Sequence, residues 1–446
     1  MATYPWVPVP EGSYFPIQNL PYGVFSRAGE APRVGVAIGE HVLDLAGLAH
    51  TGALDELPRS VAGAGGGTAP GAREWFAARS LNPFMAAGPQ AWRALRRTVT
   101  EVLTSTDRRR DAEPHLVPAG EARMRMPFEV ADYVDFYSSR DHAENAGRIF
   151  RPDGEPLPPN WLHMPAGYHG RAGTVVVSGT AVRRPRGQIV KPGGGPPSFG
   201  PTEKLDVEAE VGFVAGVPSQ PGQPVAAGSF PAHVFGFVLV NDWSARDIQA
   251  WESRPLGPFL GKSFATSVSP WVVPLEALQA AWVRPPRQDP APLDHLRCTG
   301  PWGLDLALEL ELNGHVVARP PFAGMYWTAP QQLAHATSNG AALRTGDLFA
   351  SGTVSGPRRD QRGCLLELTW DGREPLELPD GTRRAYLADG DVVRIRASAP
   401  GADGTRIGFG EVSGTVVPPF RFHDRGALPA FRPGFLRVML HDHERR

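Results

Sequence analysis

Cysteine is nearly absent from this chain, and so are long apolar runs and an excess of charge of one sign. Its 446 residues include two cysteines, Cys298 and Cys364, so a disulfide framework and a cysteine-based zinc site are both excluded. Basic and acidic residues number 45 and 46, and a formal net charge of −1 gives no field that would attract nucleic acid or an anionic membrane. The apolar run Phe235–Val240 is far shorter than a membrane-spanning helix requires.

Signatures of several common enzyme classes are missing as well. Gly257 and Gly261 precede Lys262, but three residues separate the two glycines where a phosphate-binding P-loop has four. The chain has no Gly-x-Gly-x-x-Gly after a predicted strand and no Gly-x-Ser-x-Gly. Its first residues lack the basic start and apolar segment of a secretion signal, so we expect a cytoplasmic location.

Glycine and proline, in contrast, are abundant, with 51 and 47 residues, which indicates many turns and short strands. We therefore expect a fold that is mostly β with some α structure. An N-terminal domain is predicted over residues 1–121, with strands at Tyr22–Ser26 and Arg33–Gly39 and a helix at Gln90–Leu103. Residues 122–446 form the second predicted domain, a large mixed β structure.

The strands of the second domain are predicted from alternating or continuous apolar runs. Phe235–Val240 is typical of a strand buried on both faces, and Asn313-Gly314 after Leu304–Leu312 indicates a hairpin turn. A Thr-x-x-Gln capping pattern predicts a helix over Thr328–Ser338. The remaining predicted strands are Thr174–Ser178, Asp206–Val214, Leu365–Thr369, Val392–Arg396 and Gly414–Val417.

Carboxylates alternate with apolar residues around position 208. On a strand, Asp206, Glu208 and Glu210 would share one face, with neighbours roughly 6.5–7 Å apart. Two such carboxylates can bind one hard cation, which takes oxygen ligands. The alternative is a strand face exposed to solvent. The same pattern occurs at Glu309 and Glu311 beside the hairpin turn, and we assign that pair to solvent.

Polar side chains also gather where the buried strand Phe235–Val240 ends. Asp242, Arg246 and Gln249 are spaced four and three residues apart, so they share one face if a helix begins early. Groups at strand exits often bind ligands or catalyse reactions, although Asp242 could instead cap the helix and pair with Arg246. Lys262, enclosed by glycines and aromatic residues, is a candidate for a positioned and desolvated cation.

A further cluster contains Asp135, Tyr137, Arg140 and His142. No second histidine follows at the four-residue spacing of a helical zinc site. An isolated histidine is more often structural or exposed than catalytic, so this cluster alone leaves the role of His142 open.

Five motifs together resemble the fumarylacetoacetate hydrolase family, and the similarity is collinear from about Asp132 to Val417. The resemblance implies a small SH3-like β-barrel domain followed by a large mixed β-sandwich or β-roll catalytic domain. The motifs are Asp135-Phe-Tyr-Ser-Ser-Arg-x-His, Leu205-Asp-x-Glu-x-Glu, Asn241-Asp-Trp-Ser-Ala-Arg-Asp-Ile-Gln, Pro255-Leu-Gly-Pro-Phe-Leu-Gly-Lys-Ser-Phe and Ala350-Ser-Gly-Thr-Val-Ser-Gly.

The resemblance also implies roles for the residues at matching positions. The metal ligands fall on Asp135, Glu208, Glu210 and Asp242, with Lys262 and Thr266 near the metal. The catalytic groups fall on His142, oriented by Glu367, and on Arg246, Gln249 and Lys262 around the reacting carbonyl. The substrate-binding positions fall on Tyr137, Arg151, Gln249, Ser253 and Thr353, and Ser253 replaces the tyrosine that this family usually has there.

The activity implied by the resemblance is hydrolysis of a carbon–carbon bond in 4-fumarylacetoacetate, the last step of tyrosine and phenylalanine breakdown. Implied with it are Ca²⁺ and/or Mg²⁺, a small-molecule diketo acid as substrate and a homodimer, without nucleic acid or membrane. One alternative is an acylpyruvate hydrolase or another enzyme of the superfamily, such as a hydratase or decarboxylase. A second alternative is a calcium-stabilised β protein that binds ligands without turnover.

Overall fold

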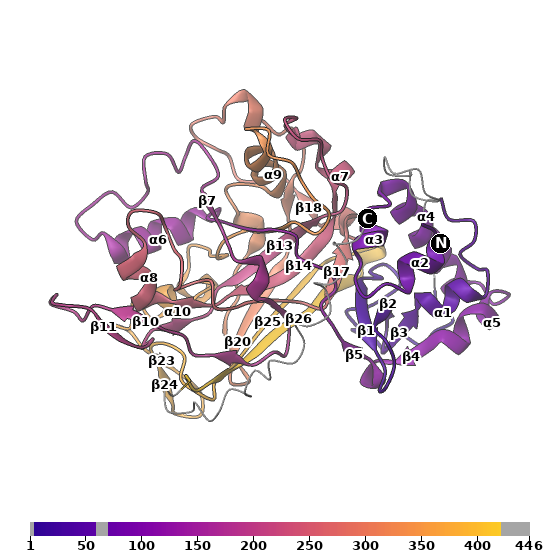
Figure 1. Ribbon diagram of the computed structural model, residues 1–446, viewed down its shortest axis with the longest axis horizontal. Coiled ribbons are helices and arrows are strands. Elements are labelled where there is room, and N and C mark those ends of the chain that lie inside the picture. The colour runs from indigo at the N-terminus through magenta and orange to yellow at the C-terminus, as the bar shows by residue number, and fades with distance from the viewer. Residues whose placement is uncertain (1–3, 59–69, 421–446) are drawn as a thin grey trace, which may run out of the picture.

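The structure, a computed structural model, describes residues 4–58 and 70–420. It is rich in β-structure with some helices, as predicted, and Figure 1 shows the N-terminal segment as a lobe beside a larger body. The largest sheet contains β1 (Tyr22–Ser26), β2 (Arg33–Ile38), β3 (His41–Asp44), β4 (Leu116–Pro118), β5 (Arg123–Met124), β6 (Tyr133–Phe136), β7 (Gly167–His169), β8 (Val175–Val177), β13 (Ala209–Ala215), β14 (Val234–Asp242), β16 (Thr266–Val268), β17 (Trp271–Pro274) and β22 (Leu348–Ala350).

A second sheet and four two-stranded ribbons complete the β-structure. The sheet has the order β21 (His315–Ala318), β20 (Ala307–Leu312), β25 (Val392–Pro400), β26 (Arg406–Val417) and β9 (Val182–Arg183). The ribbons pair β10 (Arg186–Ile189) with β11 (Ser198–Pro201), β12 (Leu205–Asp206) with β15 (Ser244–Ala245), β18 (Trp282–Val283) with β19 (Gly303–Leu304), and β23 (Leu376–Glu377) with β24 (Arg383–Arg384).

The α-helices lie around these sheets. The longest, α4, is strongly amphipathic and confirms the helix predicted over Gln90–Leu103. The capping box predicted at Thr328 begins α9. The helices are α1 (Leu45–His50), α2 (Ala72–Phe76), α3 (Asn82–Met85), α4 (Pro89–Thr104), α5 (Arg109–Ala112), α6 (Arg140–Phe150), α7 (Phe230–His233), α8 (Arg246–Glu252), α9 (Ala329–Thr337) and α10 (Leu365–Leu368).

Strands β13 and β14 form the buried centre of the large sheet, as the continuous apolar run at 235–240 predicts. Successive side chains point to opposite faces of a strand, and both faces are covered here. Phe213 and Phe237 belong to the core shared with the second sheet. Val238 and Val240 belong to a second core that includes Trp92 of α4. The N-terminal segment therefore covers one face of the sheet that carries the site described below.

The N-terminal strands do not form the expected SH3-like barrel. Strand β1 pairs with β2 on one side, and its other side pairs with both β5 and β17. In the part of the chain that the structure describes, these strands form an open series that continues into the large sheet. The division predicted at residue 121 stays a prediction, because pairing of β1 with β17 makes the sheet continuous across it.

Two other predicted elements differ in the structure. Residues 365–369 were expected to form a strand, but Leu365–Leu368 is the short helix α10. Its first turn is stabilised by Asp206, which accepts hydrogen bonds from the backbone N–H groups of Leu365 and Leu366. The predicted strand 206–214 is interrupted at Val207–Glu208, between β12 and β13. A segment as short as Leu365–Leu368, with three leucines and one glutamate, does not by its pattern distinguish a strand from a buried helix.

The register of the large sheet determines which side chains meet. Neighbouring strands β6, β22, β13, β14 and β16 place Asp135 beside Ala350, Glu210 beside Val240, and Asp242 beside Thr266. The polar ends of these strands therefore converge at one place. Over the ranges 4–58 and 70–420, no helix is both long enough and apolar enough to cross a membrane.

Candidate active site

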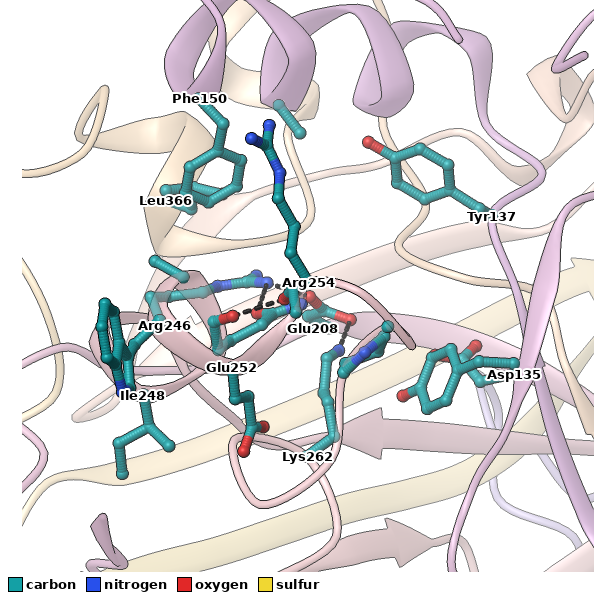
Figure 2. Close-up of a pocket in the computed structure, with 18 of the residues that line it drawn as sticks. Asp135, Tyr137, Phe150, Glu208, Arg246, Ile248, Glu252, Arg254, Lys262 and Leu366 are labelled. Atoms are coloured by element: carbon teal, nitrogen blue, oxygen red, sulfur yellow. Dashed lines mark hydrogen bonds and ion pairs between the residues drawn. The ribbon is translucent and has the colours of Figure 1, made fainter. Parts of the chain in front are cut away.

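A large cavity of about 1460 Å³ opens where these strands end. Most of the residues predicted for the site line it, and Figure 2 shows Glu208, Arg246 and Lys262 at its floor. The predicted residues on its surface are Asp135, Tyr137, His142, Arg151, Glu208, Arg246, Gln249, Ser253, Lys262 and Thr353. The other predicted residues, Glu210, Asp242, Thr266 and Glu367, do not line this cavity, but Asp242 and Thr266 line a smaller one that shares Lys262 with it.

Three of the predicted metal ligands form a compact buried cluster. Asp135, Glu208 and Asp242 each place one carboxylate oxygen within 4.8 Å of the others. All three are at most 3% exposed. The alternative of a solvent-exposed strand face is therefore wrong for Glu208, and it is also wrong for Glu210 in β13, which is fully buried.

The donor set fits a hard divalent cation. Oδ1 of Asp135 and both carboxylate oxygens of Glu210 are buried and have no hydrogen-bond partner. Burial, followed by the charges of neighbouring carboxylates, raises the pKa of Asp135 and of Glu210 well above their usual ranges. Buried carboxylates without partners are unfavourable, and a cation would compensate their charge. Only oxygen donors are present in this cluster, which suits Ca²⁺ or Mg²⁺ better than soft metals.

Two buried cations border the same carboxylates. Nζ of Lys262 lies 2.6 Å from Oε2 of Glu208 and 2.9 Å from Oδ2 of Asp242. Arg246 places Nη1 2.5 Å from Oε1 of Glu208 and Nε 2.8 Å from Oδ2 of Asp206. Burial opposes ionisation of Glu208, but Arg246 and Lys262 outweigh it and hold the pKa of Glu208 well below its usual range.

Asp242 has a dense set of hydrogen bonds and does not cap the helix that follows. Its Oδ1 accepts a hydrogen bond from Thr266 Oγ1 at 2.7 Å, and its Oδ2 accepts one from Tyr168 at 2.8 Å. Because Arg246 pairs with Asp206 and Glu208 instead, the alternative of an Asp242–Arg246 pair is wrong. Thr266 and Lys262 therefore both contact the carboxylate cluster.

A histidine–carboxylate pair forms the other half of the site. Nδ1 of His142, in the first turn of α6, lies 2.6 Å from Oε2 of Glu367 in α10. Asn145 and Ser355 also donate hydrogen bonds to Glu367, at 2.8 and 2.7 Å. Burial opposes ionisation of Glu367, but His142 and these hydrogen bonds lower its pKa from 4.5 to about 2. A charged Glu367 fixes Nδ1 as a donor and leaves Nε2 of His142 as the acceptor.

The side chains predicted to hold the substrate surround the cavity. Thr353 is buried, and its Oγ1 has no hydrogen-bond partner. Arg151 donates one hydrogen bond to the carbonyl oxygen of Pro156 and forms no ion pair with a described residue. Gln249 accepts a hydrogen bond from Arg246 Nη1 at 3.2 Å, and Ser253 donates its hydroxyl to the Gln249 carbonyl. The Ser253 hydroxyl is therefore already used by the backbone of α8.

Two carboxylate assignments from the sequence need correction. Asp206 does not join Glu208 and Glu210 in one cluster, because the strand breaks after β12 and Asp206 turns to Arg246 and α10. Glu309 is half exposed as expected, but Glu311 is only 12% exposed and pairs with Arg394 and Arg396. Assigning Glu311 to solvent was wrong, since the cross-strand arginines of β25 cover it.

Sequence reasoning also missed several polar residues that support the site. Tyr168 in β7, Asn145 in α6 and Ser355 all bind a carboxylate of the site. Only Asn145 carries a signal in the sequence, because it lies three residues after His142, on the same face of the helix. Tyr168 and Ser355 reach their partners through tertiary packing.

A buried carboxylate cluster suited to a divalent cation lies beside a histidine–carboxylate pair in one cavity, an arrangement that fits an enzyme able to activate water next to a metal ion. Profiles of two protein families match the chain, described as "Fumarylacetoacetase N-terminal" over residues 18–127 and "Fumarylacetoacetate (FAA) hydrolase C-terminal" over residues 132–417. The chain therefore belongs to the fumarylacetoacetate hydrolase family.

Relatives over nearly the whole length agree with this assignment. Fumarylacetoacetase of Homo sapiens is 45% identical over 93% of this chain and 98% of its own. Fumarylacetoacetase of Arabidopsis thaliana is 43% identical over 93% of this chain and 98% of its own. A solved structure, fumarylacetoacetate hydrolase from Exiguobacterium antarcticum, has 17% identity and a TM-score of 0.51, covering 90% of this chain and 99% of that chain, and it supports the fold alone.

Proposed function

We propose that this enzyme hydrolyses 4-fumarylacetoacetate to fumarate and acetoacetate. The observation that carries the proposal is one cavity with the His142–Glu367 pair on one side and the carboxylates around Glu208 on the other. Whole-length relatives named fumarylacetoacetase support the same substrate. Such an enzyme completes the breakdown of tyrosine and phenylalanine.

The reaction adds water across a carbon–carbon bond. The water oxygen attacks the carbonyl carbon that joins the fumaryl group to the methylene of the diketone. The bond to the methylene then breaks, the fumaryl carbon becomes the carboxylate of fumarate, and the electron pair leaves as the enolate of acetoacetate. A proton from the site or from solvent converts this enolate to acetoacetate. The site therefore needs a base, donors for an oxyanion and stabilisation of an enolate.

His142 is the proposed base, with Nε2 accepting the proton of the attacking water. Glu367 holds the tautomer and stabilises the imidazolium that results, as in other histidine–carboxylate pairs. Arg246, Gln249 and Lys262 are the proposed donors to the oxyanion and to the departing enolate. Tyr137, Arg151, Ser253 and Thr353 are proposed to hold the rest of the substrate, since all four line the same cavity.

Asp135, Glu208, Glu210 and Asp242 are proposed to hold Ca²⁺ or Mg²⁺. When bound, this cation would supply positive charge to the oxygens of the diketone. The adjacent Lys262 and Arg246 carry their own positive charges, and they balance the excess of carboxylates around the site. Lys262 and Thr266 are near-metal positions, because each already donates to a carboxylate.

Three further features of the proposal rest on the sequence and on the family resemblance. A homodimer is proposed, and sedimentation equilibrium would measure its mass. A cytoplasmic location is proposed, and the two free thiols of Cys298 and Cys364 are compatible with a reducing compartment. A domain boundary between residues 121 and 122 is proposed, close to the ends of the two matched profiles.

The experiment that tests the function follows the ultraviolet absorbance of the diketone. Purified enzyme is mixed with 4-fumarylacetoacetate and, separately, with simpler acylpyruvates. The proposal predicts rapid loss of absorbance with fumarylacetoacetate and formation of fumarate and acetoacetate in equal amounts. A clear preference for an acylpyruvate would favour the alternative of an acylpyruvate hydrolase. Absence of turnover on every diketo acid, with stability that depends on calcium, would favour a non-enzymatic protein.

A further inference from the structure

A cationic side chain at the rim of the cavity has no assigned role. Arg254, two residues after the end of α8, lines the cavity and is exposed. It forms no hydrogen bond or ion pair with any residue in the described ranges. Figure 2 shows its side chain extending across the cavity towards Phe150, away from the carboxylate of Glu208. Its guanidinium group therefore faces the space that a substrate would occupy.

The other cations of the cavity differ in whether their charge is already balanced. Arg246 and Lys262 are buried and paired with carboxylates of the floor. Among the residues that the structure describes, Arg151 has the carbonyl oxygen of Pro156 as its one hydrogen-bond partner. Among the described cavity residues, Arg151 and Arg254 are thus the two arginines without a carboxylate partner.

The carboxylate nearest to Arg254 in the sequence is occupied elsewhere. Oε1 of Glu252 accepts hydrogen bonds from the backbone N–H groups of Phe259 and Gly261, at 2.8 and 2.7 Å. These bonds fix the loop that leads to Lys262 and keep Glu252 engaged. Arg254 is therefore available to an anion that enters from solvent.

We propose that Arg254 binds a terminal carboxylate of the substrate and makes the site selective for diketo acids that carry a carboxylate at each end. This inference rests on the proposed function, because 4-fumarylacetoacetate has one carboxylate at each end of its diketone. A guanidinium group can donate two parallel hydrogen bonds to a carboxylate. Arg151, the cavity's other arginine without a carboxylate partner among the described residues, is then available to the second carboxylate of the substrate.

The size of the cavity is compatible with this arrangement. Its volume of about 1460 Å³ exceeds the ~300–1,000 Å³ typical of small-molecule sites, so an extended dicarboxylate has room. An acylpyruvate with an uncharged acyl group has a single carboxylate, which Arg151 would bind, so Arg254 would be left without an anion. Selectivity between the two substrate classes would then come from this residue, since both classes present the same diketone to the floor.

The test compares Arg254→Gln and Arg254→Lys with wild type on 4-fumarylacetoacetate and on acetylpyruvate, which has one carboxylate. Arg93→Gln is the matched control, because Arg93 is an exposed arginine on α4 outside the cavity. For Arg254→Gln we expect KM for fumarylacetoacetate to rise about tenfold, the effect of losing one charge-assisted contact at a partly solvated site. We expect kcat to be unchanged, because ground-state and transition-state binding weaken equally.

Arg254→Gln should leave KM for acetylpyruvate within about twofold of wild type. Arg254→Lys should recover part of the lost affinity for fumarylacetoacetate, and Arg93→Gln should have the wild-type KM for both substrates. An unchanged KM for fumarylacetoacetate in Arg254→Gln, or an equal rise for both substrates, would overturn the inference while leaving the proposed function intact. Failure of the wild type to hydrolyse fumarylacetoacetate would instead overturn the proposed function, and the inference with it.

Discussion

Replacing Glu367 by glutamine tests the histidine–carboxylate pair most sharply. Glu367 is fully buried and accepts hydrogen bonds from His142, Asn145 and Ser355. The lowering of its pKa from 4.5 to about 2 corresponds to roughly 3 kcal/mol in favour of the carboxylate. If the same charge stabilises the imidazolium of His142 in the transition state, its loss slows turnover by about two orders of magnitude.

A second effect adds to this loss. The glutamine amide can accept hydrogen bonds only through its oxygen, whereas both carboxylate oxygens of Glu367 accept them. One donor is then left facing the amide nitrogen, and His142 is no longer held in the tautomer that a base requires. We therefore expect kcat to fall by roughly 10²–10⁴, within the range for a mispositioned general base.

The assay is the ultraviolet loss of the diketone at saturating 4-fumarylacetoacetate. Glu309→Gln provides the control, since Glu309 in β20 is half exposed and pairs with Arg319 on the surface. That variant should keep wild-type turnover. A kcat for Glu367→Gln within about threefold of wild type, in a variant that is folded by circular dichroism, would refute the role of Glu367.

Further predictions concern the metal, the substrate and pH. Chelation should abolish turnover, and Ca²⁺ or Mg²⁺ should restore it. Calorimetry should show weaker metal binding in Glu208→Gln and unchanged binding in Glu309→Gln, and an equal loss of metal affinity in both variants would contradict the metal assignment. Ser253→Tyr should lower KM for fumarylacetoacetate by up to about tenfold with kcat unchanged, and unchanged constants on two diketo acids would exclude a substrate contact at residue 253. The stability that ionised Glu367 contributes is complete above about pH 4.5 and is lost as pH falls towards 2. The difference in unfolding free energy between wild type and Glu367→Gln should therefore shrink by roughly 2 kcal/mol from pH 5 to pH 3. A difference that stays constant over this range would contradict the low pKa of Glu367.

Sequence patterns correctly predicted the helices and strands that show a single clear local signal, such as amphipathic spacing, a capping motif or a long apolar run. The amphipathic spacing of α4, the capping box of α9 and the continuous apolar run of β14 all appear where expected. Local rules failed where tertiary contacts decide the structure. The segment at 365–369 is helical because the carboxylate of Asp206 caps it, and the two residues are far apart in the sequence.

The residues of the candidate site likewise divide into those that the sequence identified and those whose placement depends on tertiary structure. Motif resemblance identified Asp135, Glu208, Asp242 and His142, which the fold brings to one cavity or directly behind it. The alternation of carboxylates and apolar residues wrongly grouped Asp206 with Glu208. That rule assumes one continuous strand, whereas the strand is interrupted between β12 and β13. The convergence of these residues depends on strand order and register in the large sheet, including the parallel pairing of β6 with β22, and no local signal encodes that pairing.

The central claim is that His142 acts as a base in the hydrolysis of 4-fumarylacetoacetate. The most direct measurement is kcat for wild type and for His142→Asn on this substrate, with fumarate and acetoacetate quantified and metal binding measured in parallel. We predict equal amounts of the two products from the wild type, a decrease of roughly 10²–10⁴ in kcat for the variant, and little change in metal affinity. Turnover of the variant close to the wild-type rate would contradict the claim.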